Sequence, residues 1–113
     1  MVTIQGIGRL SQEPKMDYMP NGTARTVLNM ALTSGFGDKK KTTWARAVCF
    51  GTAAEILNER VSKGQRLSFT AEFQEVQTYE KRDGGTGVSV ELKILAFEFI
   101  EKSQGGNQEP EEF

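Results

Sequence analysis

The segment Thr43–Phe50 contains the residues whose types and spacing point most clearly to chemistry. Its large and small side chains alternate: Trp44, Arg46, Val48 and Phe50 on one side, and Ala45, Ala47 and Cys49 on the other. In a β-strand, such alternation places the two sets on opposite faces. Because an unpaired arginine is costly to bury whereas alanine and cysteine fit a crowded interior, we expect the large face to point outward. Exposed aromatic rings beside a guanidinium can stack nucleic-acid bases while the cation follows the phosphates, so this strip is a candidate surface for single-stranded nucleic acid.

Two loops place further cations next to aromatic side chains. Phe36 precedes one group and Tyr79 precedes the other, and the cations are Lys39, Lys40, Lys41, Lys81 and Arg82. On one sheet, two such loops would form a groove whose cations hold phosphates and whose rings stack bases. Two alternatives stay open: the loops are ordinary solvated hairpin tips, and Trp44 and Phe50 are covered by a helix or by a second subunit.

Length and composition limit the architecture. The chain has 113 residues, of which 37% are hydrophobic and 26% are charged, values typical of one globular domain. No apolar stretch approaches the roughly 18 residues that a membrane helix needs, and Met1–Gly6 lacks the features of a secretory signal. We therefore expect a single folded domain and no membrane span.

The residues on which most metal and hydrolytic sites depend are missing from the sequence. The chain has no histidine and one cysteine, Cys49, so it can build neither an intramolecular disulfide nor a Cys/His zinc site. The missing imidazole also removes the commonest general base and the catalytic triads that need it. We expect no metal, no cofactor and no enzymatic activity.

Charge is divided between a weakly basic body and an acidic end. Residues 1–102 hold 14 basic and 12 acidic side chains, whereas residues 103–113 hold three acids and no base. The polar, glycine-containing composition of the last segment predicts a flexible tail. The expected organisation is a folded domain over residues 1–102 and a tail over residues 103–113, whose tip consists of Glu109, Pro110, Glu111, Glu112 and Phe113.

Apolar and polar residues alternate in five runs, with the period of strands that have one buried face. The expected strands are Val2–Leu10, Ala24–Leu32, Thr43–Phe50, Arg66–Val76 and Val88–Ile100. Three strands have apolar residues in step that should face the core: Leu28, Met30 and Leu32; Leu67, Phe69, Ala71 and Phe73; and Val88, Val90, Leu92 and Ile94. The phase changes near Leu95–Phe97, which predicts a bulge or strand end there, and Gly6 and Gly8 predict a bend or bulge in the first strand.

A short helix is expected between the third and fourth of these strands. Thr52-Ala53-Ala54-Glu55 fits a capping box, and Lys63-Gly64 marks the helix end. The helix should bury Ile56, Leu57 and Val61. Three strands, one helix and two strands make an all-β chain with the element order of the OB-fold, a five-stranded, partly open barrel that binds oligonucleotides or oligosaccharides.

Several motifs together resemble the bacterial single-stranded DNA-binding protein family. They are Gly8-Arg9-Leu10 with Glu13-Pro14, Tyr18-Met19-Pro20-Asn21-Gly22, Trp44-Ala45-Arg46-Ala47-Val48-Cys49-Phe50-Gly51, Ala54-Glu55 and Lys63-Gly64. The resemblance covers residues 1–102 and implies an OB-fold that binds and protects single-stranded DNA in replication, recombination or repair. It implies base stacking by Trp44 and Phe50, and it puts the family's two hairpin aromatics near Phe36 and at Tyr79.

The same resemblance implies an assembly and protein partners. The family is homotetrameric, so we expect a homo-oligomer, either a tetramer or a dimer. In the family an acidic tip ending in phenylalanine recruits replication and repair proteins, a role that would fall here to Phe113 and its carboxylate. The expected location is cytoplasmic and nucleoid-associated, or plastid- or thylakoid-associated if the chain is of the short, divergent cyanobacterial and plastid type.

Three departures from the family pattern bear on affinity and assembly. Glu75-Val76-Gln77 stands where the family has basic residues, and Asp17 replaces the basic residue that precedes Tyr18. Fewer phosphate contacts should lower both the affinity for DNA and its salt dependence. Ala45 replaces a histidine that helps to hold the family's subunits together. The acidic substitutions favour one alternative function, an OB-fold adaptor for other proteins with weak or lost DNA binding. A second alternative is a binder of single-stranded RNA, which would use the same stacking residues.

Overall fold

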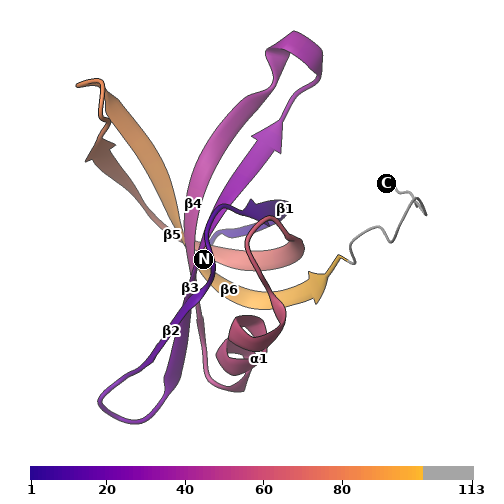
Figure 1. Ribbon diagram of the computed structural model, residues 1–113, viewed down its shortest axis with the longest axis vertical. Helices are drawn as coiled ribbons and strands as arrows, with labels where there is room; N and C mark the ends of the chain where they lie inside the picture. The colour runs from indigo at the N-terminus through magenta and orange to yellow at the C-terminus, as the bar shows by residue number, and fades with distance from the viewer. Residues whose placement is uncertain (101–113) are drawn as a thin grey trace.

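The computed structural model describes residues 1–100. Within this range the chain forms six strands, one α-helix and one 3₁₀ turn (Figure 1): β1 (Thr3–Leu10), β2 (Lys15–Tyr18), β3 (Ala24–Ser34), η1 (Gly37–Lys39), β4 (Lys41–Phe50), α1 (Thr52–Arg60), β5 (Arg66–Glu80) and β6 (Thr86–Phe99). The short strand β2, which pairs with the start of β3, adds to the five strands expected from the sequence. The helix follows the strand that ends at Phe50, as expected, but the additional strand places it between β4 and β5 instead of between the third and fourth strands.

The strand pairings form a closed ring. The order in the sheet is β1-β5-β6-β4-β3-β2, and β1 pairs with β3 as well as with β5. All pairs are antiparallel except β4 and β6, which run parallel because the crossover through α1 and β5 separates them. Figure 1 shows the β3–β4 and β5–β6 hairpins diverging at one end of the molecule and α1 lying toward the other end.

The core lies inside this ring and under α1. The residues predicted to face inward on the second and fourth expected strands are buried, apart from Leu32 and Phe73, which are partly buried; the buried ones are Leu28, Met30, Leu67, Phe69 and Ala71. Strand β1 crosses this core closely, because a Cβ on Gly8 would lie 2.8 Å from the Sδ atom of Met30. The register of β1 with β5 is unbroken from Thr3 to Arg9, so the β1 glycines permit close packing rather than a bulge.

Two bulges interrupt the pairing of β5 with β6. Ile94 pairs with Ala71 and Ala96 pairs with Thr70, which leaves Leu95 without a partner and confirms the predicted irregularity. A second bulge on β5, not expected from the sequence, skips Gln74. Each extra residue bends its strand and increases its twist.

The prediction for the start of β6 is partly wrong. Leu92 and Ile94 are buried and Val90 is partly buried, but Val88 is 49% exposed. Val88 lies in the part of the β5–β6 hairpin beyond the pairing with β4, which covers Ser89 to Lys93. The alternation of apolar and polar residues continues in this part of the hairpin, but no core lies beneath it to bury Val88.

The expected capping box is also wrong. The residue that precedes the helix is Gly51, with φ of 78°, and no side chain caps the helix start. The Gly51 N–H donates to the Ala24 carbonyl, which turns the chain directly after β4, so Thr52 is already the first helical residue. The helix ends at Arg60 rather than near Lys63-Gly64, and Leu57 and Val61 are buried while Ile56 is exposed.

A buried hydrogen bond joins the helix to the sheet. The Thr26 hydroxyl donates to the Ala54 carbonyl at 2.6 Å, and the Thr26 side chain is fully buried on β3. Removing the donor would leave a buried helical carbonyl with one partner fewer, so Thr26→Val is expected to lower the free energy of unfolding by about 1–3 kcal/mol, measured by urea denaturation. The matched control Thr33→Val changes an exposed threonine of the same strand and should have little effect. Equal losses in the two variants would contradict the assigned role of Thr26.

Candidate nucleic-acid interface

Strand β4 separates its small and large residues as expected. Ala45, Ala47 and Cys49 face the core with at most 2% of their surface exposed. Trp44 and Phe50 point outward and are 42% and 38% exposed. The outward orientation is therefore confirmed, and α1 does not cover the two rings.

Two cations that the sequence reasoning missed flank Phe50. Arg25 on β3 is directly opposite Phe50 in the strand register, and the Nζ atom of Lys93 on β6 lies 6.0 Å from the centre of the Phe50 ring. At that distance an ammonium is attracted to the face of an aromatic ring. The sequence contained the information needed to find them. Leu28 and Leu92 face the core, and side chains alternate along a strand, so Arg25 on β3 and Lys93 on β6 must point outward.

The arginines of this surface are paired with carboxylates. Arg46 Nη1 lies 3.1 Å from Glu91 Oε1, and these two residues are directly opposite in the β4–β6 register. Arg25 holds both oxygens of Asp17, with its Nε at 3.1 Å and its Nη2 at 2.7 Å. The hydrogen bonds from Arg25 keep the pKa of the Asp17 carboxyl below its ordinary value, and the same contact raises the pKa of Arg25. The Arg25–Asp17 pair is therefore ionised at neutral pH.

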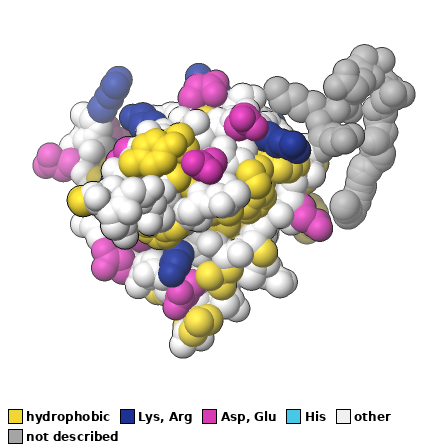
Figure 2. Space-filling view, turned by 90° about the horizontal axis from the view of Figure 1, so that it is seen from below, with side chains coloured by type: hydrophobic (Ala, Val, Ile, Leu, Met, Phe, Trp, Pro, Cys, Tyr) yellow, Lys and Arg dark blue, Asp and Glu magenta, His cyan; other side chains and the backbone are white. Residues whose placement is uncertain are grey.

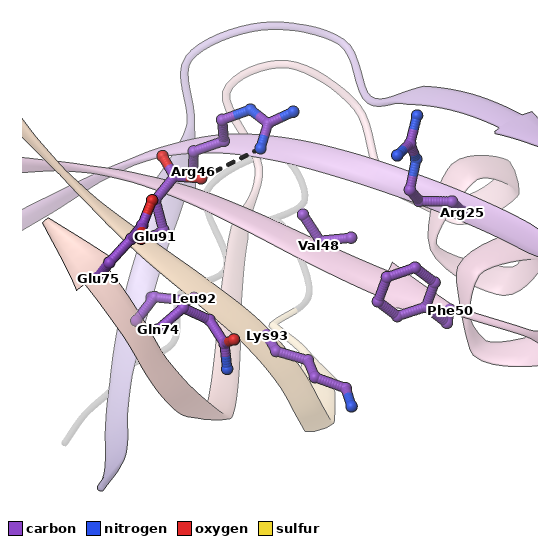
Figure 3. A pocket seen from close by; sticks show the side chains of 9 residues that line it. All are labelled: Arg25, Arg46, Val48, Phe50, Gln74, Glu75, Glu91, Leu92 and Lys93. Atoms are coloured by element: carbon purple, nitrogen blue, oxygen red, sulfur yellow. Dashed lines mark hydrogen bonds and ion pairs between the residues drawn. The ribbon is translucent and has the colours of Figure 1, made fainter. Parts of the chain in front are cut away.

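A hollow of about 360 Å³ opens between these groups. Figure 3 shows its lining, with Val48 between the Arg46–Glu91 pair on one side and Phe50 on the other; the remaining residues are Arg25, Gln74, Glu75, Leu92 and Lys93. The volume falls within the roughly 300–1,000 Å³ range of small-ligand sites. An apolar floor with an aromatic ring and charged groups at its edge suits a planar base attached to a charged backbone.

The β3–β4 hairpin presents Phe36 and the lysine run at its tip. Phe36 is 91% exposed, and Lys39, Lys40 and Lys41 are exposed as well. The turn needs glycine at position 35, where φ is 91° and a Cβ would lie 2.4 Å from the Lys39 carbonyl oxygen. The hairpin thus holds a ring and three cations away from the body of the molecule.

The β5–β6 hairpin positions Tyr79 through a glycine. Tyr79 pairs with Gly87 across the two strands, and the tyrosine ring occupies the space where a Cβ on Gly87 would be. The turn that follows contains Lys81 and Arg82, both exposed. The hollow near Phe50 differs from the groove that we expected between the two hairpin tips. Residues of the strands line it, and no residue of either tip does.

Acidic and basic side chains are interspersed on the surface. On the face seen in Figure 2, Lys and Arg alternate with Asp and Glu around exposed hydrophobic side chains, and that face has no continuous basic patch. This mixture agrees with the net charge of −1 for the whole chain. The predicted partner-binding tip, Glu109 to Phe113, lies outside the described residues.

Residues 1–100 contain neither a candidate metal site nor a helix that could cross a membrane. In that part of the chain, no three Asp, Glu, Cys or His side chains are grouped as metal ligands would be. Its only α-helix, α1, has nine residues and falls far short of the length needed to cross a membrane.

Two comparisons with known proteins relate the chain to binders of single strands. The sequence model of the single-strand binding protein family matches residues 1–100. A similar curated protein is single-stranded DNA-binding protein 1 of Xylella fastidiosa (strain 9a5c), which is 28% identical over 111 residues, covering 93% of this chain and 81% of that protein.

The inward orientation of Cys49 can be tested with a thiol reagent. Burial raises the pKa of the Cys49 thiol, so at mildly alkaline pH less of it is the reactive thiolate and the reagent cannot reach it. We expect no labelling by a disulfide reagent at pH about 8 in the native protein, and complete labelling in urea. The control is a Thr42→Cys and Cys49→Ala double variant, whose thiol lies on the exposed side of β4 and should react at once. Fast native labelling of Cys49 would contradict the orientation of the strand.

Proposed function

The chain belongs to the single-strand binding protein family, and from that premise we propose that it binds and protects single-stranded DNA without sequence preference, through the outer face of β4 and the two hairpins. The observation that carries the proposal is the outward strip of Trp44, Arg46 and Phe50, since aromatic rings stack every base and cations hold the backbone. Binding only the unpaired strand shifts the melting equilibrium toward open DNA. No chemical reaction is part of this function.

The site extends along the strands rather than forming an enclosed pocket. Trp44 and Phe50 are six residues apart on β4, about 20 Å at a rise of roughly 3.3 Å per residue. Several nucleotides therefore pass between the two rings. Tyr79 on β5, with the cations Lys81 and Arg82 in the turn after it, extends the surface at the β5–β6 hairpin. Phe36 with Lys39, Lys40 and Lys41 extends it at the tip of the β3–β4 hairpin.

Assembly and partners follow from the family and stay predictions. We infer a homo-oligomer, a tetramer or a dimer, and a role in replication, recombination or repair, with the acidic tip ending at Phe113 recruiting partner proteins. A cytoplasmic, nucleoid-associated location would accompany this role.

One observation favours the adaptor as a second candidate function. Both arginines of the β4 surface are paired with carboxylates, so they attract phosphate less than free cations would. An OB-fold that binds proteins instead of DNA would tolerate such pairing. The two candidates differ in whether Trp44 responds to an oligonucleotide.

Stacking at Trp44 is tested by titrating the protein with oligo-dT. Trp44 is the only tryptophan, so its emission should be quenched as a base stacks on it, and quenching should weaken with added salt. Trp44→Ala should lose about 1–3 kcal/mol of binding free energy, or about 5- to 150-fold in affinity, measured by anisotropy of a labelled oligonucleotide.

The matched control is Ile56→Ala, because Ile56 is exposed to a similar degree, 39%, but lies on α1. This variant should bind like the wild type. No quenching and no anisotropy change with wild-type protein would reject DNA binding and leave the adaptor. Tighter binding to oligo-U than to oligo-dT would favour the RNA alternative.

A further inference from the structure

The strand register places an acidic residue opposite each of the two arginines near Trp44 and Phe50, Arg25 on β3 and Arg46 on β4. Asp17 is opposite Arg25 in the β2–β3 register, and Glu91 is opposite Arg46 in the β4–β6 register. Side chains that are directly opposite on neighbouring strands lie close enough to interact, so oppositely charged ones can form an ion pair. The two ion pairs are therefore built into the sheet, at 2.7 and 3.1 Å.

Both arginines stand where a DNA backbone would pass. Arg25 is the direct neighbour of Phe50 on β3, and Arg46 follows Trp44 at the next outward position of β4. A strand whose bases stack on the two rings must bring its phosphates close to these guanidinium groups. Arg25 already holds a carboxylate through two N–H groups, a geometry that also suits phosphate, and Arg46 holds one through a single contact.

We propose that Asp17 and Glu91 are internal competitors of the DNA backbone, so that phosphates bind to Arg25 and Arg46 by exchange for these carboxylates. The proposal rests on the proposed function. The exchange is accessible because an ion pair at the protein surface contributes little net stability. The arginine side chains of the two pairs are 40% and 47% exposed, so a phosphate can approach them from solvent.

Lys93 differs from the two arginines. In the described part of the chain it has no carboxylate within ion-pair distance, and its ammonium lies near the Phe50 ring. Glu75 is opposite Glu91 in the β5–β6 register and adds a further negative charge at the edge of the hollow. Its carboxylate accepts a hydrogen bond from the Gln77 amide. The surface thus offers one free cation close to Phe50 and two that are neutralised.

Competition of this kind has a measurable signature in salt dependence. A cation that binds a phosphate of single-stranded nucleic acid releases condensed counterions and adds about 0.7 to the slope of log affinity against log salt. When the cation must first leave its own carboxylate, the charge brought to the DNA is smaller and the slope is shallower. Removing the acid restores the full contribution.

The experiment is the oligo-dT titration of the full chain over a salt series, with Asp17→Asn, Glu91→Gln and the double variant. Each substitution should tighten binding several-fold at low salt and steepen the slope by about 0.7, which is roughly a 2.5-fold greater loss of affinity between about 50 and 200 mM salt. The double variant should show both increments, because the two pairs share no residue.

The control is Glu59→Gln, which changes the net charge equally but removes an exposed helical acid with no ion pair among residues 1–100. It should leave the slope unchanged. Slopes in Asp17→Asn and Glu91→Gln equal to that of Glu59→Gln, in protein that still binds, would overturn the exchange and leave DNA binding intact. Absence of binding in the wild type and in every variant would instead overturn the proposed function, and the exchange with it. Binding that appears only in the double variant would support competition by the two carboxylates but would reject DNA binding by the wild-type chain.

Discussion

The tight interior of the closed strand ring is the constraint on which the rest of this structure depends. Where β4 crosses that interior, only small side chains fit, and Ala45, Ala47 and Cys49 occupy it with almost no exposed surface. Because side chains alternate strictly along a strand, the large residues between them must lie on the outer face. Shifting the register by one residue would bury Arg46 and expose the alanines. The packing of the core and the exposure of Trp44 and Phe50 are therefore determined together.

The same alternation determines the electrostatics of the outer face. Neighbouring strands place outward residues side by side, and here the partners of the two arginines are acids. The surface combines exposed rings with two arginines that are neutralised by carboxylates, which agrees with residues 1–102 carrying only two more basic than acidic side chains. Under the proposed function, stacking would therefore be the main source of attraction on this face, and the cations would determine how strongly salt changes it.

Irregular positions adapt the sheet to carry this face beyond the core. The bulges at Gln74 and Leu95 change the phase of β5 and β6, so that both strands can close the ring and then continue as a hairpin. On that hairpin, Gly87 leaves room for the Tyr79 ring to lie across the sheet. The hollow beside Phe50 forms next to the Gln74 bulge, with Gln74 in its lining. Local departures from regular pairing thus shape the surface, while the regular part holds the core.

The sequence by itself determined most of what depends on local periodicity: the order of the helix and of every strand except β2, the inward faces of β3 and β5, the outward face of β4 and the irregularity at Leu95. It misjudged Val88, because alternation does not reveal where the core ends, and Thr52, because a hydrogen bond from Gly51 to distant Ala24 sets the helix start. Arg25 and Lys93 were within reach of the same periodicity. The acidic partners of the arginines could not be predicted in this way. Which acid lies opposite which arginine depends on how the strands pair, and only the tertiary structure decides that register.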